Sequence, residues 1–300
     1  LRQGWLNYLD ILFKEQNELE EEKSKLLAAT DKEEIRKITK EIVMLRSKLD
    51  ALPQNKIGAQ KVFKVQCVSS ARNHRTETTG FRLEGLEGII TVLHGIVGCK
   101  KIRIFNDAGE INFKNLELVK ADIQHDVALL HSVKFKNFKV SGLPAAEGQS
   151  TYEELYIIGY PLGMLSSLIT SHINIRMPPI KKLWSLIPPS LIRAMKNRQS
   201  PSIEVNVLSL EGSVLPGQSG APLLNGENQV VGIINGGLRG GTVGVSWAIP
   251  LKDIQFQPVD AIREELVRLS NLPLFNDKSV PDPETEKNTE DKGHSSEGLL

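Results

Sequence analysis

The first fifty residues carry apolar side chains at the spacing of α-helices. Between residues 31 and 52 these side chains recur at alternating steps of three and four, the period of a coiled-coil seam. They are Ile35, Ile38, Ile42, Leu45, Leu49 and Leu52. Thr30 and Glu33 have the spacing of a capping box at the start of this helix, and Pro53 ends it. Residues 5–29 repeat a large apolar side chain every seven positions, so we expect a helical hairpin over 5–29 and 31–52.

Two roles are open for this helical segment, which we assign to residues 1–54. A short antiparallel hairpin packs on itself or on the rest of the chain. Its start carries four large apolar residues, Trp5, Leu6, Leu9 and Phe13. Because one partner helix does not cover all of them, the second role is a docking or oligomerisation arm, in which residues 5–52 bind a protein partner or a second copy.

From residue 57 onward the pattern changes to short apolar and alternating runs that are separated by Gly, Asn and Asp, as is typical of β-strands joined by turns. The expected strands cover 61–68, 79–83, 88–93, 100–105, 116–121, 127–131, 154–158, 202–208, 229–235 and 243–248. This succession predicts a mainly β fold within residues 55–275. We expect two antiparallel β-barrels with the functional residues at their junction.

Three segments depart from the strand pattern. Residues 164–201, with two Pro-Pro pairs and several basic side chains, are interpreted as a long loop. Its apolar run at 183–187 needs cover, so the loop either folds against its own barrel or caps a cleft or binds a partner. Residues 260–269 have a helical pattern, and the acidic, Pro- and Ser-containing residues 276–300 predict a disordered tail.

The overall charge argues against some classes of partner. The 300 residues have a formal net charge of +1 with 24% charged residues, so nothing directs the chain to nucleic acid or to a membrane surface. No apolar run reaches the roughly 18 residues that a transmembrane helix needs. The first residues are polar and amphipathic, which predicts no secretory signal.

The clearest chemical signal is a serine between two glycines. In the segment LPGQSGAPLL, residues 215–224, Ser219 is flanked by Gly217 and Gly220. Glycines adopt backbone conformations closed to other residues, so this turn can expose the hydroxyl and direct adjacent N–H groups to one point. Such a turn describes a nucleophile beside an oxyanion hole.

A candidate base and a candidate acid lie upstream. The run IITVL, residues 89–93, delivers His94 to the end of a strand, and Asp126 opens the apolar run VALL. Taken singly, each has an ordinary explanation: a strand-end histidine bonded to backbone, a turn aspartate, a loop hydroxyl. Together with Ser219 they match the requirements of nucleophilic catalysis.

These motifs resemble those of the trypsin/chymotrypsin-like serine peptidases, whose patterns are roughly T-A-x-H, D-[IL]-A-L-L and G-x-S-G-[GA]-P. The order histidine, aspartate, serine is that of the chymotrypsin type and differs from the subtilisin and α/β-hydrolase orders. Gly80-Phe81 and the runs at 158–163, 230–233 and 248–250 are similar to the Deg (HtrA) branch. The resemblance covers residues 58–256, and we expect a peptidase domain without a PDZ module.

The resemblance implies a chymotrypsin-like double barrel and a serine endopeptidase acting on protein substrates. Ser219 would attack the peptide carbonyl, His94 would take and return the proton, and Asp126 would fix the imidazole tautomer. The N–H groups of Gly217 and Ser219 would hold the oxyanion. We expect no cofactor and no metal.

Neighbouring residues refine this prediction. Four positions are assigned to the substrate pocket: Ser213, Ile234, Asn235 and Gly236. Ser213 stands where a trypsin-type preference for Lys or Arg requires an acidic residue, so we expect small or apolar residues at the cleaved position. Asp122 and His125 lack the motif context and are interpreted as surface residues.

Gln218 bears on activation. In trypsin-type zymogens an aspartate at this position pairs with the ammonium of a newly cut N-terminus. Opposite an uncharged amide, a buried ammonium would lack its counter-charge, at a cost of several kcal/mol. The segment 58–62 also has no matching cut site. We therefore expect a chain that is competent uncut, or that is switched by a partner or by loop ordering.

The cysteine count predicts the compartment. Secreted relatives usually carry several disulfides, whereas only Cys67 and Cys99 occur here, so we expect a protein that is either cytoplasmic or independent of disulfides. Pairing of the two across neighbouring strands stays open. The alternative function is a catalytically silent trypsin-fold module that binds through its helical arm, which a missing triad residue would favour.

Overall fold

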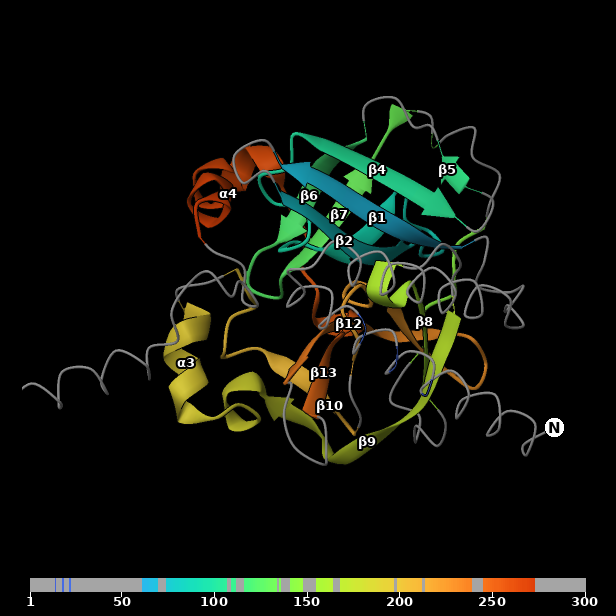
Figure 1. Cartoon of the computed structure of the whole chain (residues 1–300), viewed down its shortest axis with the longest axis vertical. Coiled ribbons are helices and arrows are strands. Elements are labelled where there is room, and N and C mark those ends of the chain that lie inside the picture. The colour runs from blue at the N-terminus through green and yellow to red at the C-terminus, as the bar shows by residue number, and fades with distance from the viewer. Residues whose placement is uncertain are drawn as a thin grey trace, which may run out of the picture.

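A computed structural model describes the chain over most of its central region. The described residues are 61–69, 74–106, 109–111, 116–133, 135, 141–147, 155–163, 168–196, 199–211, 214–238 and 245–272, with the single helical positions 14, 18 and 22. The rest of the predicted hairpin, residues 5–52, and the predicted tail, residues 276–300, lie outside them. The described chain is mainly β and forms two antiparallel sheets, one above the other in Figure 1.

The first sheet has eight strands in the spatial order β14-β6-β7-β3-β2-β1-β4-β5. They are β1 Val62–Ser69, β2 His74–Phe81, β3 Ile89–Val92, β4 Lys101–Asn106, β5 Gly109–Ile111, β6 Glu117–Asp122, β7 Val127–His131 and β14 Gln257–Pro258. β14 comes late in the chain and pairs with β6. The segment that follows the second sheet is therefore fastened back onto the first.

The second sheet closes into a barrel in the order β10-β13-β12-β11-β8-β9. Its strands are β8 Leu155–Gly159, β9 Leu168–Lys182, β10 Asn206–Glu211, β11 Pro222–Asn225, β12 Val230–Leu238 and β13 Val245–Pro250. Closure removes the unpaired edges that an open sheet would present. The predicted mainly β fold is confirmed, and the two antiparallel barrels expected from the sequence correspond to one closed barrel and one eight-stranded antiparallel sheet.

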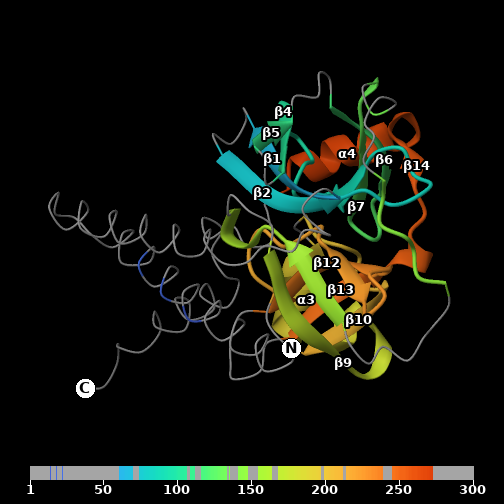
Figure 2. The ribbon, with the colours of Figure 1, turned by 90° about the vertical axis from the view of Figure 1, so that its right-hand side faces the viewer.

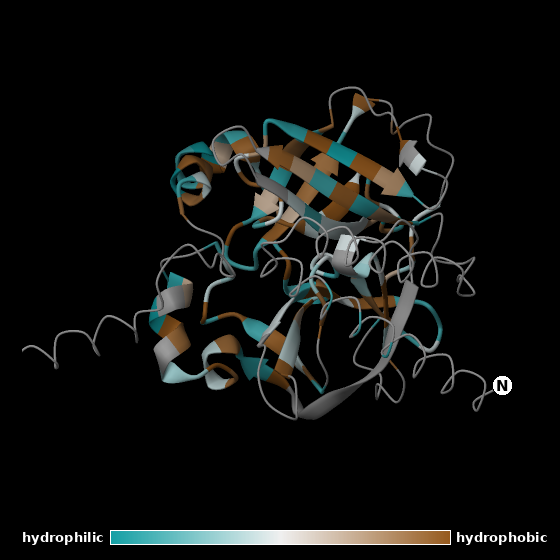
Figure 3. Cartoon of the chain, in the orientation of Figure 1, coloured by the Kyte–Doolittle hydropathy of each residue, from teal (hydrophilic) through white to brown (hydrophobic). Residues whose placement is uncertain are grey.

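Side-chain alternation builds the cores of the two sheets. Apolar and polar residues alternate along β1 and β4 in Figure 3, and on β4 Ile104 is buried whereas Lys101 is exposed. One cluster of buried side chains includes Phe81 and Leu129 from the first sheet together with Tyr160 and Trp247 from the second half of the chain. The two sheets therefore share packed side chains at their junction.

The interpretation of residues 164–201 as a long loop is wrong. Residues 168–182 of this segment form β9, which pairs with both β8 and β10. Pro178 and Pro179 suggested a break, but they lie between Ile175 and Ile180, where the pairing with β10 shifts register. Proline is tolerated in a strand at such an irregularity, because no ladder hydrogen bond is required of it there.

Short helices complete the described fold. They are η2 Pro161–Gly163, η3 Leu183–Ser185, α3 Pro189–Lys196, η4 Leu251–Asp253, η5 Val259–Ile262 and α4 Arg263–Ser270. The helical prediction at 260–269 thus corresponds to η5 and α4, which pack Ile262, Leu266 and Leu269 onto the first sheet (Figure 2). Among the described residues, no helix has the length and apolar character to cross a membrane.

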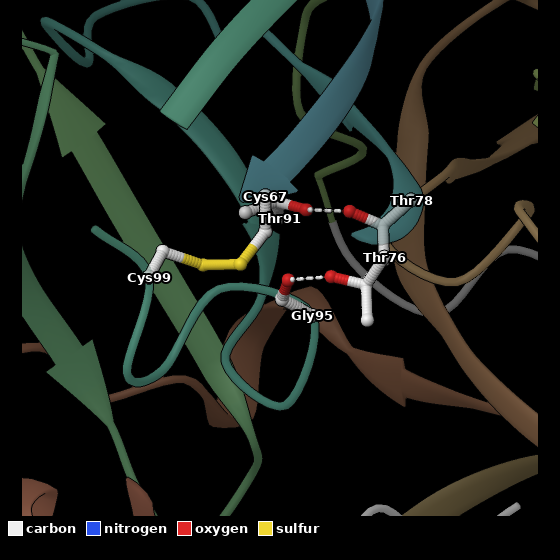
Figure 4. Close-up of a disulfide and its surroundings, with 6 residues drawn as sticks. All are labelled: Cys67, Thr76, Thr78, Thr91, Gly95 and Cys99. Carbon is white, nitrogen blue, oxygen red and sulfur yellow. Dashed lines mark hydrogen bonds between the residues drawn. A yellow bond between two sulfur atoms is a disulfide. The ribbon is translucent and has the colours of Figure 1, made fainter. Parts of the chain in front are cut away.

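Cys67 and Cys99, whose pairing the sequence leaves open, form a disulfide. Their Cα atoms are 5.6 Å apart. The end of β1 lies beside the loop that follows β3, since Lys100 N–H donates to the carbonyl of Val68 at 3.0 Å. Figure 4 shows the bridge beside a second tether of the same loop, in which the Thr76 hydroxyl donates to the Gly95 carbonyl at 2.8 Å.

Candidate active site

His94 and Asp126 meet at the ends of two paired strands. β3 and β7 are antiparallel with Val92 opposite Val127, which sets the residues after β3 beside the residue before β7. His94 N–H donates to Asp126 Oδ1 at 2.8 Å, and Leu93 N–H donates to the Asp126 carbonyl at 2.9 Å. The side chains pair as well, with His94 Nδ1 2.5 Å from Asp126 Oδ2. The structure thus brings the predicted base and acid together.

Asp126 has an unusual backbone conformation. Its φ of 57° lies in the left-handed region, which aspartate tolerates better than most residues. Its N–H donates to the carbonyl of Ile123 at 3.3 Å, closing a tight turn between β6 and β7. The carboxylate is buried and receives its hydrogen bonds from the protein. Backbone strain of this kind occurs preferentially at functional sites.

The environment of His94 sets its protonation chemistry. Burial lowers the pKa of His94, but the charge of Asp126 and its hydrogen bond outweigh that effect and raise the pKa above the usual histidine value. Because the carboxylate accepts from Nδ1, the proton of the neutral ring resides on Nδ1. Nε2 is then the atom that can accept a proton, and the side chain is 22% exposed.

Asn235 supports the acid from the second sheet. Its Nδ2 donates to Asp126 Oδ2 at 2.9 Å, and its Oδ1 accepts from Trp247 Nε1 at 3.1 Å. An indole nitrogen only donates, so Trp247 requires the amide oxygen on its side. The amide NH₂ of Asn235 is thereby directed at the carboxylate of Asp126.

Ser219 follows a tight turn whose geometry suits the two residues at its centre. Gln218 N–H donates to the carbonyl of Leu215 at 3.0 Å, which leaves Pro216 and Gly217 at the central positions. Gly217 has a φ of 91°. Proline followed by a residue of positive φ is the signature of a type II turn. Ser219, just beyond the turn, is partly exposed.

The Ser219 segment lies against the end of β3 that leads to His94. Gly220, with a φ of 86°, approaches so closely that a Cβ there would lie 2.1 Å from the Thr79 carbonyl oxygen and 3.1 Å from Val92 N. Thr79 N–H also donates to the Ser219 carbonyl at 2.8 Å. Since Val92 is two residues before His94, Ser219 and His94 lie at the same end of the strand.

The two predicted oxyanion donors have no other use in the described chain. No hydrogen bond among the described residues employs the N–H of Gly217 or that of Ser219. The intervening Gln218 N–H is bonded within the turn. Two backbone donors beside a partly exposed hydroxyl can bind an oxygen that gains negative charge.

A second histidine–aspartate pair corrects the interpretation of Asp122 and His125 as surface residues. Asp122 is 5% exposed. Its carboxylate accepts from His125 Nδ1 at 2.8 Å, from His125 N–H at 3.1 Å and from Gln255 N–H at 2.7 Å. Burial raises the pKa of Asp122, but these hydrogen bonds outweigh it and hold the pKa below the usual value. This pair fastens the β6–β7 turn to the segment that precedes β14.

The positions assigned to the substrate pocket differ in exposure. Ser213 lies outside the described residues, and Ile234 is fully buried. Asn235 is turned inward, towards Asp126. Gly236 is partly exposed, and a Cβ there would lie 2.8 Å from the ring of Trp247. A cavity of about 600 Å³ elsewhere, lined by Leu86 and Leu251 among others, includes none of these positions.

Sequence reasoning missed the residues that hold the site together. Asn235 was assigned to substrate binding, and neither Trp247 nor Thr79 was singled out. The hydrogen bond between Asn235 and Asp126 joins residues 109 positions apart in the sequence. The hydrogen bond between Thr79 and Gly217 joins residues 138 positions apart. The available signal was a polar residue inside an apolar strand run, such as Asn235 within VVGIIN, which a core admits only with hydrogen-bond partners.

Comparison with known proteins places the chain in a family. The trypsin-like peptidase domain family matches residues 78–233. The serine protease Do-like HtrB of Bacillus subtilis is 30% identical over 170 residues, which cover 56% of this chain and 34% of that protein. A probable periplasmic serine endoprotease, DegP-like, of Halomonas elongata is 29% identical over 202 residues, which cover 65% and 37%.

The Rv3671c protease of M. tuberculosis in its active form aligns over 72% of this chain and 84% of that chain, with 18% identity and a TM-score of 0.49. The chain spans about a third of the length of the two curated relatives. The family match takes in just over half of the chain and contains His94, Asp126 and Ser219. The chain belongs to the trypsin-like peptidase domain family and is related to the Deg (HtrA) serine proteases.

Proposed function

We propose that the chain is a serine endopeptidase that cleaves protein substrates through Ser219, His94 and Asp126. The observation that carries the proposal is the convergence, at one end of β3, of the His94–Asp126 pair and the Ser219 turn. The Deg/HtrA relatives, which are named as serine proteases, support the same chemistry.

In the proposed reaction Ser219 Oγ attacks the carbonyl carbon of the scissile peptide while His94 Nε2 takes its proton. The electron pair of the carbonyl moves onto its oxygen, which the N–H groups of Gly217 and Ser219 stabilise. Collapse of this intermediate breaks the C–N bond, and the leaving amine receives the proton from His94. Water then attacks the acyl ester by the same route and releases the carboxylic acid. Asp126 accepts the hydrogen of His94 Nδ1 throughout and stabilises the imidazolium.

The test is covalent labelling of Ser219 by a fluorophosphonate probe. We expect labelling of the intact chain, none in Ser219→Ala, and strong loss in His94→Ala. Turnover of a peptide substrate should fall by several orders of magnitude in either variant, and no further in the double variant, because the residues act as a unit. Absence of labelling in the intact chain would instead favour a silent trypsin-fold module that binds through its helical arm.

We also propose a preference for small or apolar residues at the cleaved position. Asn235 has its amide committed to Asp126 and Trp247, and Ile234 is buried, so neither offers a charge to a basic side chain. Mapping new termini after incubation of a proteome with wild type and with Ser219→Ala tests this. A profile dominated by Lys and Arg would contradict it.

Partner and compartment are further proposals. We propose that residues 5–52 dock a partner or a second copy, on the basis of the heptad seam in the sequence. The cytoplasmic location also stays a prediction, and the disulfide argues against it, because such bridges persist in oxidising compartments. Counting free thiols with a thiol reagent, on the protein as isolated from cells, decides between the two compartments. Two free thiols support the cytoplasm, and none supports an oxidising compartment.

A further inference from the structure

Thr79, on β2 of the first sheet, has a hydrogen-bond partner for every one of its polar atoms, and its N–H and hydroxyl bond to the second half of the chain. The side chain is fully buried. Its N–H donates to the Ser219 carbonyl at 2.8 Å, and its hydroxyl donates to the Gly217 carbonyl at 2.7 Å. The same hydroxyl oxygen accepts from Tyr160 N–H at 3.0 Å, and the Thr79 carbonyl accepts from the Thr91 hydroxyl at 2.7 Å.

The direction of the bond to Gly217 follows from these partners. A hydroxyl has one hydrogen to donate, and a backbone N–H can only donate. Because Tyr160 N–H supplies the hydrogen in its own bond, the Thr79 hydroxyl hydrogen is available for the Gly217 carbonyl, which can only accept. One threonine therefore holds two carbonyls of the serine segment from the opposite sheet.

These bonds fix the peptide unit after Gly217 and the peptide unit after Ser219, which flank the unit that carries the Ser219 N–H. In a planar trans peptide the carbonyl and the N–H of the next residue point in opposite directions, so anchoring these two carbonyls orients the N–H groups of Gln218 and Gly220. The Ser219 N–H lies in the unit between them and is restricted from both sides. The unit after Gly217 is held by Thr79 and by the bond of Gln218 N–H to Leu215. The unit after Ser219 is held by Thr79 and, within the second barrel, by the hydrogen bond that Gly220 N–H donates to the carbonyl of Ile234.

The unit between them is held at its carbonyl alone. The Gln218 carbonyl accepts from Ala221 N–H at 2.9 Å, so the Ser219 N–H of the same unit points away from Ala221. The turn is closed a second time by its own side chain, since Leu215 N–H donates to Gln218 Oε1 at 2.6 Å and Gln218 is 1% exposed. The amide side chain of Gln218 thus helps to order the turn.

We propose that Thr79 is a positioning residue that keeps the oxyanion donors of Gly217 and Ser219 aimed at the substrate, so that the turn is preformed in the uncut chain. This inference rests on the proposed serine endopeptidase function. It assigns to a buried hydroxyl of the first sheet, together with the Gln218 amide, the ordering that a released N-terminal ammonium supplies in trypsin-type zymogens. The donors are then ordered whenever the two sheets are packed together.

Two substitutions at position 79 separate the hydroxyl from the shape of the side chain. Thr79→Val keeps the branched shape but leaves the Gly217 carbonyl and Tyr160 N–H without their buried partner. Thr79→Ser keeps the hydroxyl and removes a methyl group. Wild type, both variants and Ser219→Ala are compared for fluorophosphonate labelling, for kcat and KM on a peptide substrate, and for inhibition by a peptide aldehyde whose adduct carries an oxyanion.

If the proposal holds, Thr79→Val lowers kcat and aldehyde affinity by about 10- to 100-fold with little change in KM, because oxyanion contacts form only in the transition state. Thr79→Ser should remain close to wild type. Thermal unfolding of both variants identifies loss of folding, and hydrogen exchange of the amides of residues 214–221 is measured on the folded protein. Exchange should be faster in Thr79→Val than in Thr79→Ser.

Equal kcat and equal aldehyde affinity in Thr79→Val and wild type would overturn the inference while leaving the endopeptidase proposal intact. Absence of labelling in wild type overturns the endopeptidase proposal itself. The hydrogen-exchange comparison still tests the positioning role of Thr79 in that case. Unchanged exchange in Thr79→Val overturns that role, and faster exchange supports it. Should Thr79→Val fail to fold, Thr79→Ala, which also lacks the hydroxyl, is measured in its place against Thr79→Ser, with the same expected and contrary results.

Discussion

At the scale of single residues, the pairing of His94 with Asp126 determines how the site responds to pH. The pKa of His94 is raised above its usual value of about 6.5. A general base must be neutral, so kcat/KM should rise with pH through a midpoint above 6.5. Asp126→Asn removes the charge that raises the pKa, and the midpoint should then move to lower pH as kcat falls. A wild-type midpoint below 6.5 would contradict the assignment.

The raised pKa of His94 also predicts how stability depends on pH, and this dependence runs opposite to that of activity. A histidine whose pKa is higher in the folded than in the unfolded state stabilises the fold when it is protonated. The contribution of His94 is therefore fully present below the unfolded pKa of about 6.5 and is lost as pH rises through the folded pKa. Urea unfolding of wild type and His94→Ala across this range measures it. Activity and this part of the stability should change in opposite directions with pH.

The Trp247–Asn235–Asp126 chain should matter for turnover more than for binding. A hydrogen bond to a charged group contributes about 1.5 to 3 kcal/mol, which corresponds to a change of about 10- to 100-fold in rate. We expect a loss of that size in kcat for Asn235→Ala. Trp247→Phe keeps an aromatic ring but no longer fixes the amide, so its loss should be smaller. Equal kcat in wild type and Asn235→Ala would show that Asp126 is positioned without this support.

At the scale of elements, the serine turn and β3 fit together because Gly220 has no side chain. Gly220→Ala combines a positive φ, which costs about 1 to 2 kcal/mol for other residues, with a Cβ placed 2.1 Å from the Thr79 carbonyl. We expect a large loss of both stability and labelling. Gly85→Ala, with a φ of 76° and open space around it, isolates the conformational cost. Gly226→Ala, with open space and no positive φ, should be close to neutral.

The Cys67–Cys99 bridge should stabilise the first sheet. The two cysteines are 32 positions apart, and a loop of that size contributes about 3 to 4 kcal/mol when cross-linked, according to the chain-entropy estimate. Cys67→Ala with Cys99→Ala should lower the free energy of unfolding by up to this amount. Dithiothreitol should destabilise wild type and leave the double variant unchanged. If reduction has no effect on wild-type unfolding, the bridge does not contribute to stability.

At the scale of the whole molecule, the sequence predicts elements better than it predicts the contacts between them. Period-two apolar runs located most strands to within a few residues, and the motif contexts singled out His94, Asp126 and Ser219 from the chain. β9 was missed because its two prolines lie at a register shift that only the barrel reveals. The hydrogen bond of Asn235 to Asp126 was not predicted because Asp126 belongs to the other sheet.

The two sheets therefore depend on each other at the proposed site. The first sheet supplies His94, Asp126 and Thr79, whereas the second supplies the Ser219 turn and Asn235. Neither sheet alone contains a complete set of reacting and positioning groups. This division explains why local pattern could single out the proposed reacting residues, while the residues that contact them could be identified only from tertiary contacts.

The N-terminal segment contributes no residue to this set, so its removal separates docking from chemistry. Deleting residues 1–54 should leave Ser219 labelling and cleavage of a small peptide close to wild type, because every proposed reacting group lies between His94 and Asn235. Complex formation, measured by sedimentation velocity, should be lost. Leu45→Glu on the predicted seam should reproduce that loss, whereas Ser47→Glu, which introduces the same charge beside the seam, should not. If the deletion and wild type sediment alike and bind the same partners, the segment has a structural role in its own chain.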